Sequence, residues 1–326
     1  MRTIKGITAL TLVAAVAAAC TGGAASPSPA ATEAPTTAPT EAPSAPPTEA
    51  PSEAVATPDP CAPETLALKT AGTMTIGTDN PAYPPYFEAG DGEFTVPWEN
   101  LGYTGDPGSG KGFESAVAYA VADKLGFAKD KVAWVVVPFT NSFAPGAKTF
   151  DFLINQVSYK PERAEAVDLS EGYYNLNQGV VALKDNPVAK AKTLADLKAY
   201  KFGAMVGTTS YDAIQKVIVP TTETAVYDTN DAALEALKAK QIDALVVDLP
   251  TANFNVTVQI EDEAGTIVGQ LEPFGGTPEY FSLLLEKGSP LTACVNAAVT
   301  SLRDDGTLDK LASEWLPFQD TVPVLK

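Results

Sequence analysis

The sequence predicts an α/β fold with open, parallel sheets, and three observations support this prediction. Strand-like apolar segments alternate with segments of helical periodicity through residues 61–326. The run from Val132 to Val137 is continuously apolar, as in a parallel strand that is buried on both faces. Helix-opening patterns precede several helical segments. Strands and helices therefore take turns along the chain, as open α/β sheets require.

The predicted elements follow in order along the chain. A strand is expected at Met74–Thr78, and the next helix has an apolar face at every fourth residue, namely Phe113, Val117, Val121 and Leu125. After the Val132 to Val137 strand, we expect a short helix opened by Thr193 with Asp196, a strand from Phe202 to Val206, and a helix with a capping box at Thr209 to Asp212. A helix capped by Asn230 and a strand from Ala244 to Val247 follow. The last two expected elements are a helix opened by Ser289 and Pro290 and a helix capped by Thr307.

Residues 1–19 have the pattern of a signal peptide. Arg2 and Lys5 precede an apolar run, Ile7 to Ala19, that is shorter than a membrane-spanning helix requires. The run ends in small residues followed by Cys20, which resembles the lipobox of bacterial lipoproteins. This resemblance implies that Cys20 becomes the lipidated first residue of the exported protein. The alternative is an ordinary signal peptide cleaved after an A-x-A site, with an incidental Cys.

Residues 20–60 are expected to form a disordered tether. From Thr21 to Pro60 the sequence consists almost entirely of Ala, Pro, Thr, Ser and Glu and has no aromatic residue. Such a segment cannot bury enough apolar surface to offset the entropy of ordering it. Beside a lipidated Cys, a spacer that holds a domain away from a membrane is favoured over a functionless low-complexity tail. The folded part is expected to begin at Cys61.

Composition excludes several classes of function. The chain has 22 Lys and Arg against 40 Asp and Glu, a formal net charge of −18, so no basic face is available for nucleic acid. It has no His, which removes His-based catalysis and His-ligated metal sites, and its three Cys are too few for a Cys-only zinc site. No metal, cofactor or nucleic-acid partner is therefore expected.

Two cysteines remain after lipidation, Cys61 and Cys294. An exported protein folds in an oxidising compartment, where disulfides form and persist. A disulfide between these two residues is expected, with two buried free thiols as the alternative.

Polar residues follow three of the predicted strands, at the positions where open α/β sheets bind ligands. Asp79 follows the first strand, the turn Gly207-Thr208-Thr209-Ser210 follows another, and Asp248 follows a third. The turn offers N–H groups and hydroxyls to an anion, whereas Asp248 suits a cation. Arg163 can hold a carboxylate in a two-pronged ion pair. Taken singly, Arg163 would be interpreted as a solvated surface charge and Asp248 as the N-cap of the next helix. Taken together with the other polar strand ends, the two residues could bind the carboxylate and ammonium groups of an amino acid.

A series of short motifs occurs in order along residues 66–318. They are Gly77-Thr78-Asp79 with Tyr83-Pro84-Pro85, Gly112-Phe113-Glu114, Phe150-Asp151, Pro161-Glu162-Arg163-Ala164, Val167-Asp168-Leu169-Ser170, Gly207-Thr208-Thr209, Ile242-Asp243-Ala244 with Asp248, and Asp305-Gly306-Thr307-Leu308 with Trp315. In this series the chain resembles the extracytoplasmic solute-binding proteins of ABC importers, in the class that takes polar amino acids.

The resemblance implies a fold of two Rossmann-like α/β lobes, of the type II periplasmic-binding-protein kind. Two crossing strands would join the lobes, near residues 179–184 and 280–287, and the ligand cleft would lie between the lobes. Lobe 1 is expected to hold residues 61–182 plus 288–326, and lobe 2 residues 183–287.

The resemblance also implies roles for candidate ligand-binding residues. These are Asp79, Tyr83, Phe139, Ser158, Arg163, Thr208, Thr209 and Asp248. By the family pattern, Arg163, Ser158 and Thr209 hold the ligand carboxylate. Asp248 receives its ammonium group, the two aromatic residues stack against its side chain, and Asp79 lies where family members often contact that side chain.

The implied function is the binding of a small polar solute, foremost an amino acid, by lobe closure and its delivery to an ABC transporter permease. The protein is expected to be a monomer, not an enzyme, and lipid-anchored outside the cytoplasm, at the outer face of the cytoplasmic membrane or in the periplasm. Two alternatives stay open. One is an enzyme on the same fold, a dehydratase or lyase of a small carboxylic acid, and the other is a sensory ligand-binding ectodomain.

Three features depart from the family pattern. Ala116 stands where the family usually has an acidic residue, and Lys160 stands where it usually has Thr. A Gly-rich stretch with aromatic residues, 90–110, is inserted near the expected mouth of the cleft. This insertion is expected either to act as a lid or side-chain selector anchored by Trp98, or to fold on its own aromatic residues as an Ω-like loop.

Overall fold

The computed structural model describes residues 59–318 and 321–326. All of them belong to one contiguous unit, Ala56–Lys326. The predicted signal peptide, the lipidation site at Cys20 and nearly all of the predicted tether lie outside the described residues. Within the described residues, no helix is long and apolar enough to span a membrane.

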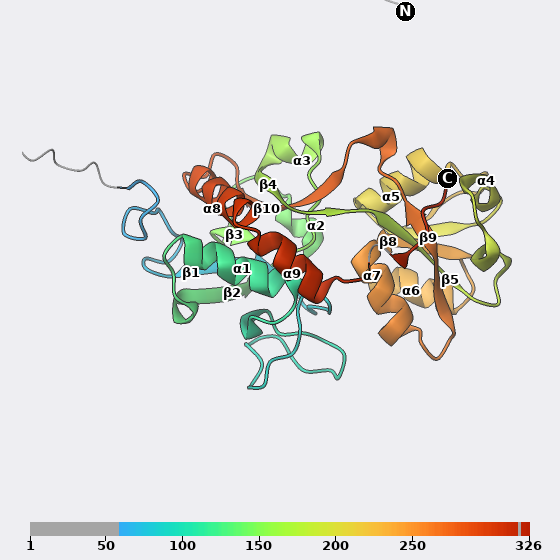
Figure 1. The fold of residues 1–326 in the computed structure, drawn as a ribbon, viewed down its shortest axis with the longest axis horizontal. Coiled ribbons are helices and arrows are strands. Elements are labelled where there is room, and N and C mark those ends of the chain that lie inside the picture. The colour runs from blue at the N-terminus through green and yellow to red at the C-terminus, as the bar shows by residue number, and fades with distance from the viewer. Residues whose placement is uncertain (1–58, 319–320) are drawn as a thin grey trace, which may run out of the picture. The chain divides into compact units, whose positions relative to one another are not determined.

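The described strands form two five-stranded sheets (Figure 1). The strands are β1 (Met74–Thr78), β2 (Val132–Val136), β3 (Phe152–Leu153), β4 (Val167–Leu176), β5 (Gln178–Leu183), β6 (Phe202–Met205), β7 (Ala225–Tyr227), β8 (Ala244–Asp248), β9 (Gly265–Leu271) and β10 (Glu279–Glu286). The first sheet has the order β2-β1-β3-β10-β4 and the second has the order β7-β6-β8-β5-β9. We call the bodies built on these sheets lobe 1 and lobe 2. The sequence prediction of a two-lobed α/β fold is confirmed. The expectation of parallel sheets is only partly correct, because β10 pairs antiparallel with β3 and β4, and β5 pairs antiparallel with β8 and β9.

Helices connect the strands within both lobes. They are α1 (Phe113–Lys124), α2 (Phe139–Ser142), α3 (Pro161–Ala166), α4 (Leu194–Leu197), α5 (Thr209–Ala213), α6 (Asn230–Lys238), α7 (Leu249–Phe254), α8 (Thr292–Asp304) and α9 (Thr307–Trp315). The π-helical turns Ile214–Ile218 and Asn255–Gln259 follow α5 and α7 directly. Short 3-10 turns occur at Pro107–Ser109, Lys129–Lys131, Pro187–Lys190 and Phe274–Gly276.

The main core of lobe 1 lies where α1, α8 and α9 pack against the first sheet. The apolar face predicted for α1 is confirmed, since Phe113, Val117, Val121 and Leu125 are all buried there. A disulfide also joins Cys61 to Cys294 of α8, with their Cα atoms 5.4 Å apart. The expected disulfide is thus present, and it ties the start of the folded unit to a core helix.

Lobe 2 buries both faces of its sheet. Along β5, Val180 and Ala182 belong to one core, whereas Val181 and Leu183 belong to the other. β8 alternates in the same way between the two cores. Successive side chains of a strand point to opposite faces, so a sheet covered on both sides needs a continuous apolar run.

The apolar run at Val132–Val136 forms β2 at the edge of the first sheet, and the expectation of burial on both faces is wrong. β2 lies beside β1 with no strand on its other side in the sheet order, and Val136 is 36% exposed. Apolar character alone does not distinguish a central strand from an edge strand, because that difference depends on which strands pair.

Two predicted helix caps are displaced by one residue. Thr208 rather than Thr209 caps α5, and its Oγ1 accepts a hydrogen bond from the Tyr211 N–H at 3.2 Å. Thr229 rather than Asn230 caps α6. An N-cap residue has an extended backbone, and its side chain accepts a hydrogen bond from an N–H group of the first helical turn. Several neighbouring polar residues could fill this role in both segments. The capping box of Thr193 and Asp196 is confirmed at the start of α4.

The last two helices also begin differently from the prediction. α8 begins at Thr292 after Leu291, so Ser289 and Pro290 precede the helix instead of opening it. α9 has Gly306 at its cap position, and Thr307 is its first helical residue. Asp305 supplies the capping oxygen by accepting a hydrogen bond from the Thr307 N–H at 3.0 Å.

The chain changes sheets at Asn177, between β4 and β5, and again between β9 and β10. Both changes come earlier along the chain than the expected lobe limits of 182/183 and 287/288. Residues 321–326 also lie on lobe 2, where Leu325 joins the core and the Gln270 N–H donates to the Pro323 carbonyl at 2.8 Å. The described C-terminal segment is therefore part of lobe 2, whereas the resemblance had placed it in lobe 1.

Candidate functional site

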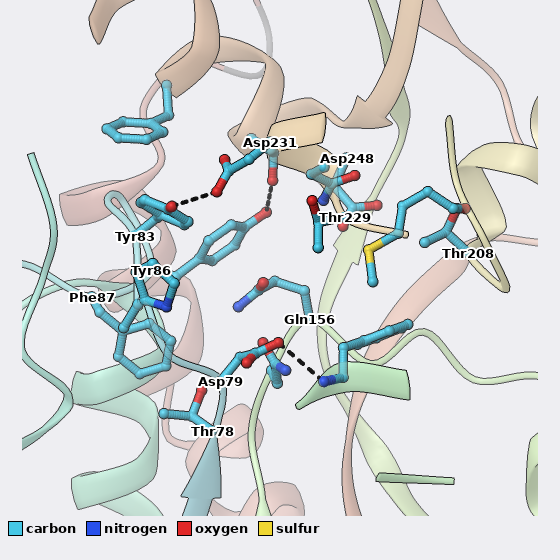
Figure 2. Close-up of a pocket in the computed structure, with 18 of the residues that line it drawn as sticks. Thr78, Asp79, Tyr83, Tyr86, Phe87, Gln156, Thr208, Thr229, Asp231 and Asp248 are labelled. Carbon is cyan, nitrogen blue, oxygen red and sulfur yellow. Dashed lines mark hydrogen bonds between the residues drawn. The ribbon is translucent and has the colours of Figure 1, made fainter. Parts of the chain in front are cut away.

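A cavity of about 210 Å³ lies between the two lobes (Figure 2). Its walls come from the ends of β1, β6 and β8 and from the starts of α2, α5, α6 and α7. One water molecule needs roughly 10–15 Å³ of such space, so the cavity has room for on the order of a dozen non-hydrogen atoms. That is the size of an amino acid.

The sequence-predicted site residues gather around this cavity with one exception. Those that line it are Asp79, Tyr83, Phe139, Arg163, Thr208, Thr209 and Asp248. Ser158 is not part of the lining, and its hydroxyl donates to Glu279 Oε1 at 2.5 Å. The Ser158 carbonyl instead supports the cavity indirectly, by accepting a hydrogen bond from Arg163 Nη1 at 2.6 Å.

Arg163, from α3, is a buried cation that lacks an anionic partner. Its residue is 8% exposed, and its second hydrogen bond runs from Nη2 to the Gly207 carbonyl at 2.9 Å. The guanidinium lies over the rings of Phe143 and Phe139. Burial lowers the pKa of Arg163 to about 10. Arg163 forms no ion pair with any described residue. A buried charge is costly unless it is paired, so the site suits an anion from outside.

The turn that follows β6 places hydroxyl groups beside Arg163. The Thr208 hydroxyl is already used, because it donates to the Met205 carbonyl at 2.7 Å and accepts from the Tyr211 N–H. The Thr209 hydroxyl lies 3.4 Å from Ser158 Oγ, and Ser210 Oγ donates to Gln178 Oε1 at 2.7 Å. Of the two threonines, Thr209 has the hydroxyl that is less committed to the backbone.

Asp248, the last residue of β8, is a carboxyl group in a low-dielectric wall of the cavity. Burial, reinforced by the nearby carboxylate of Glu279, raises the pKa of Asp248 to about 8. Gln178 Nε2 donates to Asp248 Oδ1 at 2.7 Å and holds the group in place. Asp248 begins α7 as its N-cap residue, but its side chain makes no capping hydrogen bond. The carboxyl is therefore available to a cation in the cavity.

Tyr83 connects the lobes at another part of the cavity. Its hydroxyl donates to Asp231 Oδ2 of α6 at 2.7 Å, as the dashed line in Figure 2 shows. The Tyr83 ring stacks on Tyr103, with ring centroids 6.3 Å apart, and packs against Phe254. The ring is thus held in place by Tyr103 and Phe254, and Tyr83 lines the cavity.

The insertion 90–110 packs behind the residues that follow β1, and Trp98 anchors it as expected. None of its residues lines the cavity, so it does not cover the cavity in this structure. Trp98 is buried and its Nε1–H donates to the Asp79 carbonyl at 2.8 Å, while Tyr103 stacks on Tyr83. The loop therefore folds on the body of lobe 1 and not on its own aromatic residues. It supports Asp79 and Tyr83 from outside.

Lys160, one of the departures from the family pattern, forms an ion pair between the lobes. Its Nζ lies 2.6 Å from Asp212 Oδ2 of α5. Lys216 lies four residues after Asp212, and its Nζ is 3.7 Å from the same Asp212 oxygen. The cation at position 160 thus contacts the opposite lobe and does not line the cavity. No described contact gives the other departure, Ala116, a role.

Glu114 supports the cavity from inside lobe 1. It is fully buried, and burial raises its pKa to about 7. It accepts hydrogen bonds from the Tyr173 hydroxyl and from the backbone and side chain of Gln156. Gln156 lines the cavity, and its backbone has the left-handed conformation, with φ 47°. The buried carboxyl thus holds a strained residue of the cavity wall in place.

Sequence reasoning missed a group of lining residues in lobe 2, chief among them Asp231 and Asn255. Asp231 follows β7 across a short polar turn, as Asp79 follows β1. The rule that ligands bind beyond strand ends would have found it, had the short β7 been recognised as a strand. Asn255 begins a π-helical turn, for which the sequence carries no comparable signal.

Comparisons with known proteins agree with the two-lobed fold. Residues 93–318 match the model of a family described as bacterial extracellular solute-binding proteins, family 3. The L-cystine-binding protein TcyJ of Escherichia coli (strain K12) is 28% identical over 252 residues, which cover 76% of this chain and 84% of the relative. The ABC transporter arginine-binding protein 1 of the same strain is 30% identical over 190 residues, covering 55% of this chain and 74% of the relative.

Solved structures show the same architecture. An ancestral arginine-binding protein bound to glutamine superposes with a TM-score of 0.59 at 29% identity, over 76% of this chain and 99% of that one. The family match spans well over half of the chain and covers every described strand except β1. The chain belongs to family 3 of the bacterial extracellular solute-binding proteins.

Proposed function

We propose that this protein binds an amino acid between its lobes and delivers it to the permease of an ABC transporter. One observation carries the proposal, namely that a buried, unpaired Arg163 lines the same small cavity as the carboxyl of Asp248. A ligand that satisfies both needs a carboxylate and an ammonium group close together. Relatives and neighbours whose names include cystine, arginine and glutamine support this class of ligand.

The two charged groups have separate roles in this proposal. Arg163 donates its free N–H groups to the α-carboxylate, with Thr209 beside it, and Ser158 acts through its contact with Arg163. Asp248 accepts hydrogen bonds from the α-ammonium group. Gln178 holds the Asp248 carboxyl in place through its hydrogen bond to Oδ1. Tyr83 and Phe139 pack against the rest of the ligand. Two buried polar atoms of the lining, Asn155 Nδ2 and Asn255 Oδ1, have no partner among the described residues, which further supports a polar ligand.

Closure of the lobes is the proposed mechanism of capture. Contacts between the lobes include Tyr83 with Asp231, Lys160 with Asp212, and Arg163 with the Gly207 carbonyl. Arg163 belongs to lobe 1 and Asp248 to lobe 2, so a ligand held by both favours the closed form over the open one. The permease would recognise the surface that closure creates.

We further propose that the protein is exported, is anchored to the membrane by a lipid, and acts as a monomer. Residues 1–19 would direct secretion, Cys20 would carry the lipid, and residues 21–60 would link the lipid to the folded unit. Replacement of Cys20 by Ser should release the protein from the membrane fraction into the soluble fraction. Retention of that variant in the membrane fraction would contradict the lipid anchor.

Mass spectrometry of ligand released from natively purified protein tests the proposed function. The expected result is a single free amino acid in unchanged chemical form, because we propose binding and not catalysis. Recovery of a sugar, a metal chelate or a chemically transformed acid would refute the proposal. A panel of amino acids titrated into the stripped protein then ranks their affinities.

A further inference from the structure

A chain of hydrogen bonds runs along the lobe 2 wall of the cavity and leaves one buried acceptor, Asn255 Oδ1, without a partner. The Tyr83 hydroxyl donates to Asp231 Oδ2 at 2.7 Å, and Gln259 Nε2 donates to Asp231 Oδ1 at 3.4 Å. Asn255 Nδ2 in turn donates to Gln259 Oε1 at 2.6 Å. Tyr83, Asp231, Gln259 and Asn255 all line the cavity.

The direction of this chain is fixed by its carboxylate. An ionised Asp231 only accepts, so Gln259 must present its amide nitrogen to Asp231 and its oxygen to Asn255. Asn255 must then present its nitrogen to Gln259. Its Oδ1 remains, and this oxygen has no partner even though Asn255 is 4% exposed. A buried amide oxygen without a donor marks a place where a ligand donor is missing.

Asp79 adds a second carboxylate from the other lobe. Figure 2 shows Asp79 and Asp231 on different sides of the cavity, and they come from the end of β1 and the start of α6. Asp79 accepts from the N–H groups of Phe139 and Asn80, at 3.0 and 2.8 Å, and from no side-chain donor among the described residues. The start of α6 also favours negative charge on Asp231.

Positive charge is scarce in the same lining. Arg163 is the only Lys or Arg among the described residues that line the cavity. The proposed function assigns Arg163 to the α-carboxylate of the ligand. A second carboxylate, as in glutamate or in the far half of cystine, would then face Asp79 and Asp231 with no cation to pair with.

We propose that Asp231, with Asn255 beside it and Asp79 opposite, binds a cationic group at the end of the ligand side chain. The substrate class is therefore an amino acid with a guanidinium or ammonium side chain. This inference rests on the proposed binding of an amino acid at Arg163 and Asp248. Asp231 is a specificity-determining residue of that site.

A matched pair of ligands tests the inference on the unaltered protein. L-arginine and L-citrulline share their length and shape, but citrulline carries a neutral urea group in place of the guanidinium. Calorimetric titration should give a dissociation constant roughly a hundredfold lower for L-arginine, because desolvated charge pairs are worth several kcal/mol. L-lysine should also bind more tightly than L-glutamine.

A matched pair of variants then assigns the preference to Asp231. Asp231→Asn keeps an acceptor for the Tyr83 hydroxyl and removes the charge, so the ratio of the two dissociation constants should fall about tenfold or more. Asp228→Asn removes the same charge from an exposed residue of the same turn that does not line the cavity. It should leave the ratio unchanged.

The outcomes separate this inference from the proposed function. Equal affinity for L-arginine and L-citrulline, or tighter binding of L-glutamine or L-cystine, would overturn the cationic assignment and leave amino acid binding intact. An unchanged ratio in a folded Asp231→Asn variant would overturn the role of Asp231. Binding of no amino acid at all would overturn the proposed function and this inference with it.

Discussion

The two parts of the cavity hold their charges in different ways. At the first part, the ionised forms of Arg163 and Asp248 have opposite charges, and burial lowers the pKa of Arg163 and raises the pKa of Asp248, so that both neutral forms are favoured. At the second part, Asp231 and Asp79 are both carboxyl groups held by hydrogen-bond donors, and neither forms an ion pair with a described residue. Burial also raises the pKa of Asp79. The first part therefore suits a zwitterion, whereas the second suits a cation.

On this account, the first part of the cavity sets the chemical class of the ligand, and the second part selects among ligands of that class. A buried and unpaired Arg is costly to any protein that does not need it, so the first part constrains the ligand to one chemical class. The second part can change its preference through single side chains without altering that class. Relatives with different named ligands are consistent with such a division of roles.

Loss of Arg163 should have the largest effect on binding. We expect Arg163→Ala to weaken amino acid binding by about 2 to 5 kcal/mol in calorimetry while the protein stays folded, because the ligand carboxylate would be buried without its partner. Arg303→Ala removes an exposed Arg of α8 that does not line the cavity and should bind as the unaltered protein does. Near-normal affinity in Arg163→Ala would contradict the assignment.

Loss of the charge at Asp248 should have the next largest effect. Asp248→Asn keeps an acceptor but removes the charge, so amino acids should lose about 1.5 to 3 kcal/mol of binding free energy. Desamino analogues have no ammonium group and should be affected less. If both ligand types weaken equally, Asp248 supports the fold and does not contact the ammonium group.

The pH dependence of binding should distinguish the first part of the cavity from the second. The pKa of Asp248 is raised to about 8, so at pH 6 to 7 the free protein holds a proton on this carboxyl. Binding of an ammonium group requires the ionised form, so binding should release a proton, and affinity should rise up to about tenfold per pH unit as the pH approaches 8. Asp248→Asn should remove most of this slope, and the remainder is expected from Glu114, whose pKa burial raises to about 7. An affinity independent of pH from 6 to 8 in the unaltered protein would refute this role.

The contact between Lys160 and Asp212 should have the smallest effect. Lys160→Met removes a partly exposed ion pair between the lobes, which is worth about 0 to 1 kcal/mol. We expect affinity to fall by about fivefold at most, with a smaller loss at high salt. Lys216→Met is the control, because Lys216 approaches the same Asp212 oxygen from within lobe 2. A larger effect of Lys216→Met than of Lys160→Met would show that the pair does not stabilise closure.

The sequence predicts most of the fold because local patterns and the order of elements agree. The alternation of strands and helices, the buried face of α1 and the pairing of Cys61 with Cys294 all appear in the structure. Helix starts are displaced where neighbouring polar residues compete for the cap, as at Thr208 and Thr229. The edge position of β2 depends on sheet pairing, which no local pattern encodes.

The candidate site is predicted where single residues follow long, apolar strands, and is missed where they do not. Asp79 follows β1 and Asp248 ends β8, and both strands are easily recognised, whereas Asp231 follows the short, half-exposed β7. The role of the insertion depends on two contacts that sequence cannot show, from Trp98 to the Asp79 carbonyl and from Tyr103 to the Tyr83 ring. These contacts join segments whose approach is set by tertiary packing.

The central claim is that Arg163 and Asp248 together recognise the charged ends of one amino acid. Calorimetric titration tests this claim most directly, using the amino acid that binds most tightly, its decarboxylated amine and its desamino acid. We predict that each analogue binds roughly a hundredfold or more weakly than the parent amino acid, because each leaves one of the two charged groups without its partner. An analogue that binds as tightly as the amino acid would contradict the claim.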